Sequence, residues 1–559
     1  MKRWLALPPA VSLTLLSFAV YMLTLPADLR NNADTVDRFF VTRSLLHGHL
    51  SIVCGQLKNA DTRLAFGRHH CLYAVYAPGQ SLLMAPLYVA GKIAALITQA
   101  PSAFAVAISV RSLDAVLAAL CVAVFFFLCV EAGYSRRTAI ILGLILAFAS
   151  TLWPDQQSGQ EHTQVTLALL VSGYAALKSV RLPRSRPSER DAPPSRWRTS
   201  EVWTYGSGAA AGFGLLTRYD FAVSAAIVFL FLAWASSRDS WRTTAETGVR
   251  FMVGMLPFLV ADGLWNLVRF GSFFSTGRAP ADQFGFPIWQ GIANLLASPG
   301  KGIIWYVPLV WLLPLAAASF FRRSRPLFWL CAGLVASAVL FYANVIYWHG
   351  DPGWGPRYLF PVVPFVVLPL GELLERWKKY RGWLRGSIIA VVGLSLVLQL
   401  AAVSVDPWRF WYHLIHQRQS QGQVWVWSPT HYSYYWNLAD APELYQFVAA
   451  KDVLDIALGN KQAYIRPVAA CFSGRNTGTL GGVSCRPLDT ISPIWLNDRY
   501  QWVTPGPVAL SLPERVIIVG VLLLIAGYGG LALGLYGPAR TEASKLNRSS
   551  RVLQPGPPA

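Results

Sequence analysis

Two carboxylates, Asp34 and Asp37, stand close together in the segment 31–38, directly after the first hydrophobic stretch of the chain. A carboxylate at a lipid–water boundary can accept a proton from a substrate hydroxyl, as general base catalysis requires. The aromatic residues at 39–40 and the small turn at 47–49 predict a short amphipathic helix on the membrane, with Asp34 near its start. This placement favours a base acting on a substrate that is delivered by lipid. The structural alternatives are an N-cap role for Asp34 and pairing of Asp37 with Arg38.

A second acidic position, Glu161, lies beside His162 where the chain re-enters a hydrophobic stretch. Ionisable groups are costly at such a place unless they face a cavity. Glu161 and His162 therefore either contact a substrate or form a metal or proton site, since carboxylate and imidazole are usual metal ligands. A divalent metal is possible, and the sequence identifies no cofactor with certainty.

Three cations, Arg218, Lys301 and Arg357, border hydrophobic stretches on the same expected face as Asp34. An arginine can grip a phosphate with two parallel hydrogen bonds, and a lysine acts on it as a point charge. Arg357 is followed by Tyr358 in a Gly-Pro-Arg-Tyr segment, which favours phosphate contact there. The alternatives are ordinary boundary residues for Arg218 and Lys301, and an anchoring arginine that snorkels to the interface for Arg357.

The Gly-rich segment before Arg357 contains His349 and Asp351 between two tryptophans, which makes both candidates for binding an acceptor. His47 and His49 are expected to be structural. A carboxylate and several cations at one membrane surface are what sugar transfer from a phospholipid-linked donor needs. The acid takes the proton of the acceptor hydroxyl, and the cations hold the leaving phosphate.

The elements that position these residues are expected to be transmembrane helices. Hydrophobic residues make up 54% of the 559 residues and charged residues 14%, and the mean hydropathy is +0.39. Such a composition excludes an ordinary soluble globular protein. We expect an all-α polytopic membrane protein with about twelve spans of roughly 20 residues. They lie near 8–25, 102–130, 138–153, 163–180, 203–217, 220–236, 251–268, 303–321, 327–347, 358–375, 384–404 and 513–536.

The net charge of +20 does not indicate a nucleic-acid partner, because the basic residues fall in alternate loops. By the positive-inside rule, these loops and both termini are cytoplasmic. The site then faces the periplasm or exterior, in what we expect to be a bacterial plasma (inner) membrane. The first hydrophobic stretch lacks a small-residue cleavage site and is expected to be retained.

The expected organisation is a transmembrane catalytic module at 1–404, an exported and small mixed region at 405–512, a last helix at 513–536 and a disordered cytoplasmic tail at 537–559. Within the module, 26–101 forms an exported loop with interfacial helices and 181–202 a cytoplasmic linker. Cys54 and Cys71 both fall in the first exported loop, and Cys471 and Cys485 both fall in the exported region. Two disulfides are expected in an oxidising compartment, free buried thiols being the alternative.

The chain resembles the GT-C superfamily of polyprenyl-phosphate-dependent glycosyltransferases, which includes protein O-mannosyltransferases and lipid A aminoarabinose transferases. The resemblance covers roughly residues 1–375. The matching residues are Asp34, the turn 45–49, the segment 76–81, the loop ending at Glu161, the turn 216–218 and the segment 355–361.

This resemblance implies a GT-C-like fold, with Asp34 as general base and basic residues that hold the donor phosphate. The partners implied are a polyprenyl-phosphate sugar donor, membrane lipid, and an exported lipid, glycan or protein acceptor. Many relatives carry an Asp-Glu pair in the first loop, whereas here Thr35 follows Asp34, so a second acidic role passes to Asp37 or Glu161. Direct displacement by the activated hydroxyl would invert the anomeric centre.

Two other functions remain open at this stage. A polymerase or ligase of surface polysaccharide also uses lipid-linked donors and about twelve spans. A transporter or flippase for polyprenyl lipids belongs to a different class and usually shows internal pseudo-repeats, which this sequence lacks. No Gly-rich phosphate loop followed by a strand–helix unit appears, so no nucleotide sugar is expected.

Overall fold

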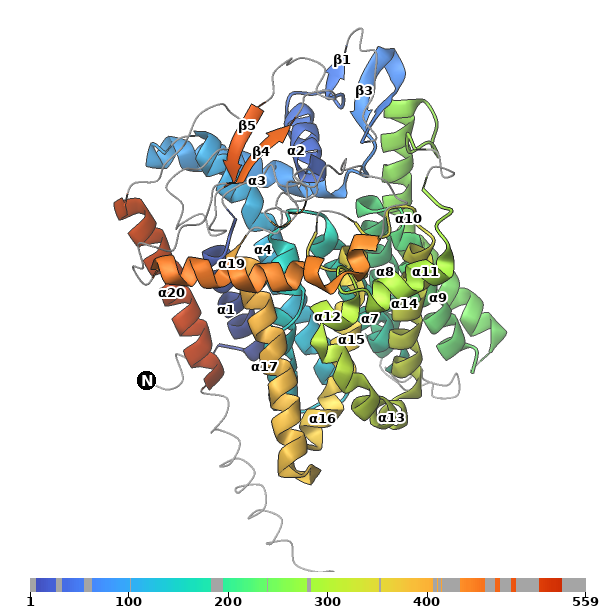
Figure 1. Cartoon of the computed structure of the whole chain (residues 1–559). Helices are drawn as coiled ribbons and strands as arrows, with labels where there is room; N and C mark the ends of the chain where they lie inside the picture. The colour runs from blue at the N-terminus through green and yellow to red at the C-terminus, as the bar shows by residue number, and fades with distance from the viewer. Residues whose placement is uncertain are drawn as a thin grey trace, which may run out of the picture.

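Helices make up most of the chain in the computed structural model (Figure 1). The structure describes residues 7–26, 33–54, 63–100, 102–181, 195–238, 240–278, 283–350, 353–405, 410, 414, 433–457, 468–472, 484–488 and 512–534.

Within these residues, six helical segments are long and apolar enough to cross a membrane. They are α3 (Gly79–Thr98), α4 (Ser102–Glu131), α10 (Trp241–Phe270), α14 (Arg325–Ala343), the segment Arg357–Glu375 and α17 (Gly382–Ser404). Together with the helix content, they confirm the expected all-α polytopic membrane class. The number of twelve spans stays a prediction.

Each of the other expected spans also coincides with helix. These helices are α1 (Pro9–Leu23), α5 (Arg136–Phe148), α7 (His162–Arg181), α8 (Ser195–Thr217), α9 (Phe221–Ser236), α13 (Leu313–Arg323) and α20 (Leu512–Gly534). The helix α8 begins at Ser195, inside the segment expected as a linker, and residues 182–194 lie outside the described part. The sequence placed α3 at the interface, whereas its length and hydropathy are those of a span.

Two of the expected spans are broken into short pieces by proline. The first contains α12 (Ile303–Tyr306), η3 (Pro308–Leu312) and α13. The second contains η4 (Arg357–Val362), α15 (Val363–Val367), η5 (Leu368–Leu370) and α16 (Gly371–Glu375), with η6 (Trp377–Lys379) after it. Proline lacks a backbone N–H and interrupts the helical ladder. Arg357 is the first residue of the second of these spans, at the start of η4.

Close packing of α8 on α10 depends on glycine. A Cβ atom at Gly208 would lie 1.9 Å from the carbonyl oxygen of Phe251, and one at Gly254 would lie 2.2 Å from that of Tyr205. No side chain fits at either position. Small residues at such contacts let helix backbones approach closely inside a membrane. This contact holds α10 against α8, and the C-terminal end of α8 lies at the candidate site.

The first loop folds into an amphipathic helix and a small sheet. Helix α2 (Ala33–Leu46) begins next to Asp34, as the sequence predicted. Strands β1 (Val53–Cys54), β2 (Leu64–Phe66) and β3 (Cys71–Ala74) pair antiparallel in the order β1-β3-β2, and η1 (Arg68–His70) precedes β3. A disulfide joins Cys54 and Cys71, which face each other in the register. The sheet lies near the top of Figure 1, beside the end of α10.

The region after α17 is mixed, as expected. It contains η7 (Ser433–Trp436), η8 (Leu438–Asp440), α19 (Pro442–Ala457) and an antiparallel pair, β4 (Val468–Phe472) with β5 (Ser484–Leu488). Helix α19 packs against α17 and crosses it in Figure 1. Cys471 and Cys485 are opposed in the register of β4 and β5. Their side chains lie outside the described part, so this second disulfide stays a prediction.

Helix α4 runs through the centre of the bundle and contacts α1, α3, α5 and α7. Beside it, the short helix α6 (Leu152–Gln156) and the turn that follows lead into α7. Helix α11 (Ile288–Ala297) packs against α14. The end of α6, the start of α7 and α2 together enclose the candidate site.

Candidate active site

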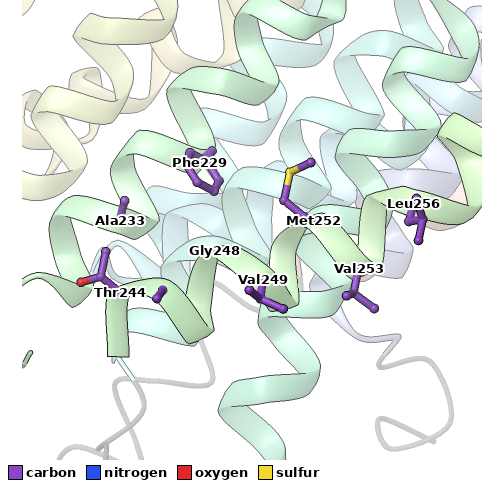
Figure 2. Close-up of a pocket in the computed structure, with 9 residues that line it drawn as sticks. Phe229, Ala233, Thr244, Gly248, Val249, Met252, Val253 and Leu256 are labelled. Atoms are coloured by element: carbon purple, nitrogen blue, oxygen red, sulfur yellow. The ribbon is translucent and has the colours of Figure 1, made fainter. Parts of the chain in front are cut away.

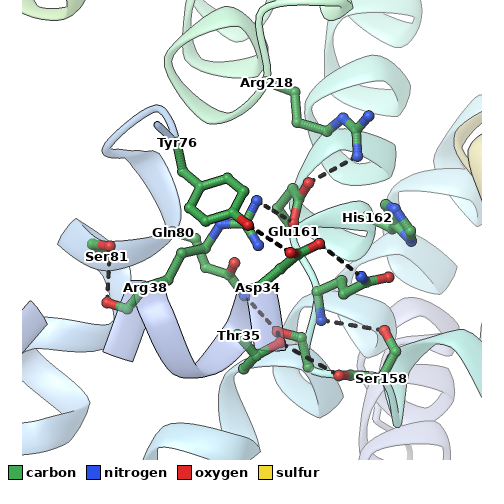
Figure 3. Close-up of polar contacts among 12 residues, drawn as sticks. Asp34, Thr35, Arg38, Tyr76, Gln80, Ser81, Ser158, Glu161, His162 and Arg218 are labelled. Carbon is green, nitrogen blue, oxygen red and sulfur yellow. Dashed lines mark hydrogen bonds and ion pairs between the residues drawn. The ribbon is translucent and has the colours of Figure 1, made fainter. Parts of the chain in front are cut away.

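Asp34 lies in the first turn of α2, and its carboxylate points into a polar cluster (Figure 3). The helix docks on the turn after α6 through the Thr35 hydroxyl, which donates to the carbonyl oxygen of Gly159 at 2.9 Å. The Tyr76 hydroxyl donates to Asp34 Oδ1 at 2.5 Å, and Gln160 Nε2 donates to Oδ2 at 3.4 Å. The carboxylate therefore contacts groups from two other segments and is not limited to capping α2.

The environment of Asp34 favours its ionised form. Burial alone would raise the pKa of this carboxyl. The guanidinium groups of Arg357 and Arg38, with the hydrogen bond from Tyr76, act in the other direction and hold the pKa below its ordinary value. The Asp34 carboxylate is thus ready to accept a proton at neutral pH.

Glu161 links two arginines immediately before α7. Its Oε2 lies 2.8 Å from Arg38 Nη2 and its Oε1 lies 2.8 Å from Arg218 Nη1. The side chains of Arg38 and Glu161 are 3% and 6% exposed, so this ion pair is shielded from water. Burial would raise the pKa of Glu161, but the two arginines lower it overall. Glu161 is therefore a fixed negative charge that orients both guanidinium groups.

Arg218 is held a second time at the start of α9. Its Nε donates to Asp220 Oδ1 at 2.9 Å and its Nη2 to Oδ2 at 2.5 Å, a two-point contact. The Tyr342 hydroxyl also donates to Asp220 at 2.7 Å, and the Tyr342 ring stacks on Tyr358 at 4.8 Å. Arg218 is accordingly a partly buried residue, 16% exposed, that two carboxylates hold in place.

Arg357 begins η4 and faces the same cluster. Its guanidinium lies 5.1 Å from the Tyr358 ring, and its Nη2 donates to the Tyr358 hydroxyl at 3.4 Å. Its Nε is buried and has no hydrogen-bond partner among the described residues. The preceding Gly-rich loop wraps around this side chain, because a Cβ atom at Gly350 would lie 2.6 Å from Arg357 Nε. Arg357 thus retains donor capacity next to Asp34.

Lys301 and His349 lie next to this loop, and each makes a contact of its own. Lys301 is fully buried, and its Nζ donates to the carbonyl oxygen of Gly353 at 2.6 Å. His349 stacks on Tyr435 at 5.7 Å. These contacts support the loop that surrounds Arg357. Asp351, the remaining acceptor candidate, lies outside the described residues.

Asp37 does not pair with Arg38. Its carboxylate lies 3.5 Å from Arg63 Nη1, and its side chain is 13% exposed. The reason is helical geometry, because consecutive residues of a helix point in different directions. Among the described residues, Arg38 forms its ion pair with Glu161, and Asp37 forms one with Arg63.

His162 pairs with Asp155 and not with Glu161. Its Nδ1 lies 3.1 Å from both oxygens of Asp155, and its Nε2 is buried without a partner among the described residues. No group of three or more His, Cys, Asp or Glu side chains suited to a metal ion occurs in the described ranges. His47 and His49 bond neighbouring carbonyl oxygens at the surface, which is consistent with a structural role.

Arg38, Arg278 and Tyr76 are among the contributors that were not selected as site residues from the sequence. Arg38 stacks on the Tyr76 ring at 4.0 Å, and Arg278 approaches the same ring at 5.5 Å. Tyr76 itself was noted only as part of the segment 76–81. The sequence signal for Tyr76 was therefore present, whereas no local pattern distinguishes Arg38 from an ordinary surface arginine.

The end of α10 holds Tyr76 in place. Arg269, only 1% exposed, donates from Nη1 to the carbonyl oxygens of Ala74 and Tyr76, the latter at 3.1 Å. Its guanidinium lies 4.7 Å from the ring centres of both Trp265 and Phe270. The Trp265 indole also donates to the Tyr76 carbonyl oxygen, at 3.4 Å. We call Arg269 and Trp265 the α10 clamp.

Comparisons with known proteins find a likeness in structure. No protein family and no curated protein matches the sequence. ArnT from Cupriavidus metallidurans bound to undecaprenyl phosphate matches with 15% identity and a TM-score of 0.43, over 98% of this chain and 81% of that chain. Archaeal oligosaccharyltransferase AglB from Archaeoglobus fulgidus, in complex with an inhibitory peptide and a dolichol-phosphate, matches with 12% identity and a TM-score of 0.43. That match covers 79% of this chain and 60% of the other.

Both TM-scores are below 0.5 and both identities are at most 15%, so the resemblance to the GT-C superfamily stays an expectation from the sequence. At this level of similarity, no residue role passes from those proteins to this chain.

Proposed function

We propose that this protein is a membrane glycosyltransferase that moves a sugar from a polyprenyl-phosphate donor to an acceptor on the exported side. The observation that supports this most directly is the Asp34 carboxylate, which accepts a hydrogen bond from Tyr76 at 2.5 Å within electrostatic reach of Arg38 and Arg357. A transferase of this kind needs a base for the acceptor and positive charge for the leaving phosphate, and this cluster offers both.

In the proposed reaction, Asp34 accepts the proton of the acceptor hydroxyl as its oxygen attacks the anomeric carbon. The new oxygen–carbon bond forms while the bond from that carbon to the phosphate oxygen breaks. The electron pair of the broken bond stays on the polyprenyl phosphate. Attack opposite to the leaving group inverts the anomeric centre. The reaction needs no further reactant.

In this proposal, Arg357 and Arg38 bind the donor phosphate, and Arg218 helps to orient Arg38. Arg357 and Arg38 have buried N–H groups without protein partners among the described residues, so they can donate to phosphate oxygens. Arg218 and Glu161 keep Arg38 oriented through two ion pairs of 2.8 Å. In this assignment Glu161 is a positioning residue, and Asp34 is the catalytic one.

The test is transfer of labelled sugar from synthetic polyprenyl-phosphate donors to a panel of acceptors by the purified protein in detergent. Asp34→Asn keeps the size of the side chain and removes the base, so the rate should fall about 10²- to 10⁴-fold. Asp37→Asn is the matched control on the same helix, because that carboxylate pairs with Arg63, and its rate should change little.

Full activity of Asp34→Asn would refute the base assignment. Absence of transfer by the wild type with every donor, together with lipid movement in sealed vesicles, would identify a transporter instead. Transfer that lengthens a lipid-linked glycan step by step would identify a polysaccharide polymerase.

A further inference from the structure

A groove of about 610 Å³ lies between α9 and α10, away from the candidate site (Figure 2). Apart from Thr244 its lining is apolar, and it consists of Phe229, Ala233, Thr244, Ala245, Gly248, Val249, Met252, Val253 and Leu256. The volume lies in the range of about 300 to 1,000 Å³ that small-ligand sites occupy. Val249 and Leu256 are 61% and 53% exposed, so the groove opens outward.

The groove and the candidate site lie at opposite ends of α9. Arg218 and Asp220 stand immediately before the first residue of α9, Phe221, whereas Ala233 lies near its last residue, Ser236. A helix of 16 residues is about 24 Å long. A lipid whose phosphate is bound at the candidate site therefore has its headgroup at the other membrane boundary.

Aromatic and basic side chains mark the membrane boundary at the groove end. Trp234 and Trp241 are 39% and 76% exposed, as expected of tryptophans at the level of lipid headgroups. The guanidinium of Arg238 lies 5.0 Å from the Trp234 ring, and that of Arg242 lies 5.8 Å from the Trp241 ring. Arg242 is one helical turn before Ala245, so it continues the lining of the groove along α10.

The acidic groups close to this end on α10 and α8 are already engaged. Glu246 lies 3.2 Å from Arg250, and Glu201 lies 3.0 Å from the same arginine. Arg238 and Arg242 are both exposed. An exposed pair of arginines at the end of an apolar groove is complementary to a lipid with an anionic headgroup.

We propose that this groove binds an anionic phospholipid of the leaflet opposite the candidate site, with one acyl chain between α9 and α10 and the phosphate at Arg238 and Arg242. By the positive-inside rule this is the cytoplasmic leaflet. The lipid is a structural ligand and not the sugar donor. The proposal does not depend on the proposed glycosyltransferase activity.

The test measures lipid retention by the full-length protein. Delipidated protein is incubated with phosphatidylglycerol, phosphatidylcholine or undecaprenyl phosphate, and bound lipid is counted by native mass spectrometry. Phosphatidylglycerol should be retained over phosphatidylcholine. Val249→Trp fills the groove and should abolish retention. Val397→Trp, at a position on α17 that is 51% exposed, is the matched control and should retain it.

A second variant tests the headgroup alone. Arg238→Gln with Arg242→Gln leaves the apolar lining intact, so it should remove the preference for phosphatidylglycerol by on the order of fivefold per arginine. Equal retention of the two phospholipids by the wild type would overturn the proposal. An equal loss of phosphatidylglycerol retention in Val249→Trp and Val397→Trp would also overturn it. Displacement of phosphatidylglycerol by undecaprenyl phosphate would do the same.

Discussion

At the residue scale, the Tyr76 hydroxyl donates to Asp34 at 2.5 Å and, after burial and the two arginines Arg357 and Arg38, contributes to the pKa of this carboxyl. This hydrogen bond lowers the pKa of Asp34. Tyr76→Phe keeps the ring that packs on Arg38 but removes the donor, so the pKa should rise. The base works when it is deprotonated, and the acidic limb of the pH–rate profile should therefore move to higher pH. The measurement is kcat/KM for sugar transfer across pH.

Tyr73→Phe is the control for this prediction, because the Tyr73 hydroxyl donates to the carbonyl oxygen of Arg68 at 3.3 Å, outside the site. Its acidic limb should match that of the wild type. An unchanged limb in Tyr76→Phe would mean that Asp34 is not the group that titrates in the reaction.

Glu161→Gln should destabilise the protein strongly, because it leaves the buried Arg38 and the partly buried Arg218 with one opposite charge fewer. Removal of one partner of a buried ion pair costs about 3–5 kcal/mol. Glu246→Gln is the control, since that carboxylate is 61% exposed and its pair contributes about 0–1 kcal/mol. Thermal unfolding of both variants in detergent measures the difference. Similar melting temperatures for the two variants would contradict the structural role of Glu161.

The pH dependence of this contribution follows from the lowered pKa of Glu161. A carboxylate with a lowered pKa stabilises the fold fully above its unfolded pKa of about 4.3 and loses this effect as the pH falls through the folded value. The difference in the free energy of unfolding between the wild type and Glu161→Gln should therefore have its full size at neutral pH. It should decrease only at acidic pH.

The sequence predicted Asp34 and the basic residues near it, because their positions at span ends are visible in the chain. It did not predict which charged side chains form ion pairs with one another. Arg38 pairs with Glu161, which is far away in the sequence, and not with its neighbour Asp37. Local spacing carries no information about such contacts, since they depend on how α2 docks on the turn before α7.

At the scale of the element, the α10 clamp connects a long apolar helix to the site. Arg269→Gln removes the Nη1 group that donates to the carbonyl oxygens of Ala74 and Tyr76. The Tyr76 hydroxyl should then no longer be held in place beside Asp34. We expect a lower kcat and an acidic limb shifted in the same direction as in Tyr76→Phe. Because both changes act through one hydrogen bond, the double variant should be little worse than either single variant.

Arg250→Gln is the control on the same helix. Arg250 pairs with Glu201 and Glu246 near the other end of α10. The acidic limb of the pH–rate profile of Arg250→Gln should therefore match that of the wild type. Additive effects of Arg269→Gln and Tyr76→Phe would show that the clamp acts on stability alone.

Helix periodicity and hydropathy were sufficient to predict α2, α4 and α17, whose apolar or amphipathic patterns are continuous. They were insufficient for α3, which contains Pro86 within a helix that continues from Gly79 to Thr98. A proline often ends a helix, but membrane helices tolerate it. The local pattern around Pro86 therefore pointed to a break that the structure does not contain.

At the scale of the whole molecule, topology can be tested at the two ends of α10. Ser237 and Ser272 are both exposed, one shortly before this helix and the other shortly after it. In sealed cells, Ser272→Cys should react with a membrane-impermeant thiol reagent. Ser237→Cys should react only after permeabilisation, because its side is predicted to be cytoplasmic. The opposite pattern would invert the topology and place the candidate site in the cytoplasm.

The membrane class followed from composition, whereas the orientation inferred from the alternation of basic loops stays a prediction. The arrangement of the region after α17 did not follow from the sequence, because its elements are short and its aromatic residues fit several folds. Helix α19 lies across α17, and no sequence pattern specifies that placement.

The paired charges around Asp34 have a consequence for turnover. Arg38, Arg218 and Arg357 are matched by three carboxylates, those of Asp34, Glu161 and Asp220. In the proposed reaction, the departing phosphate gains a negative charge at the moment Asp34 loses one by taking a proton. The catalytic step then leaves the total charge of the enclosed site unchanged. Return of that proton to water would make Asp34 repel the spent lipid phosphate, so deprotonation and product release should be coupled.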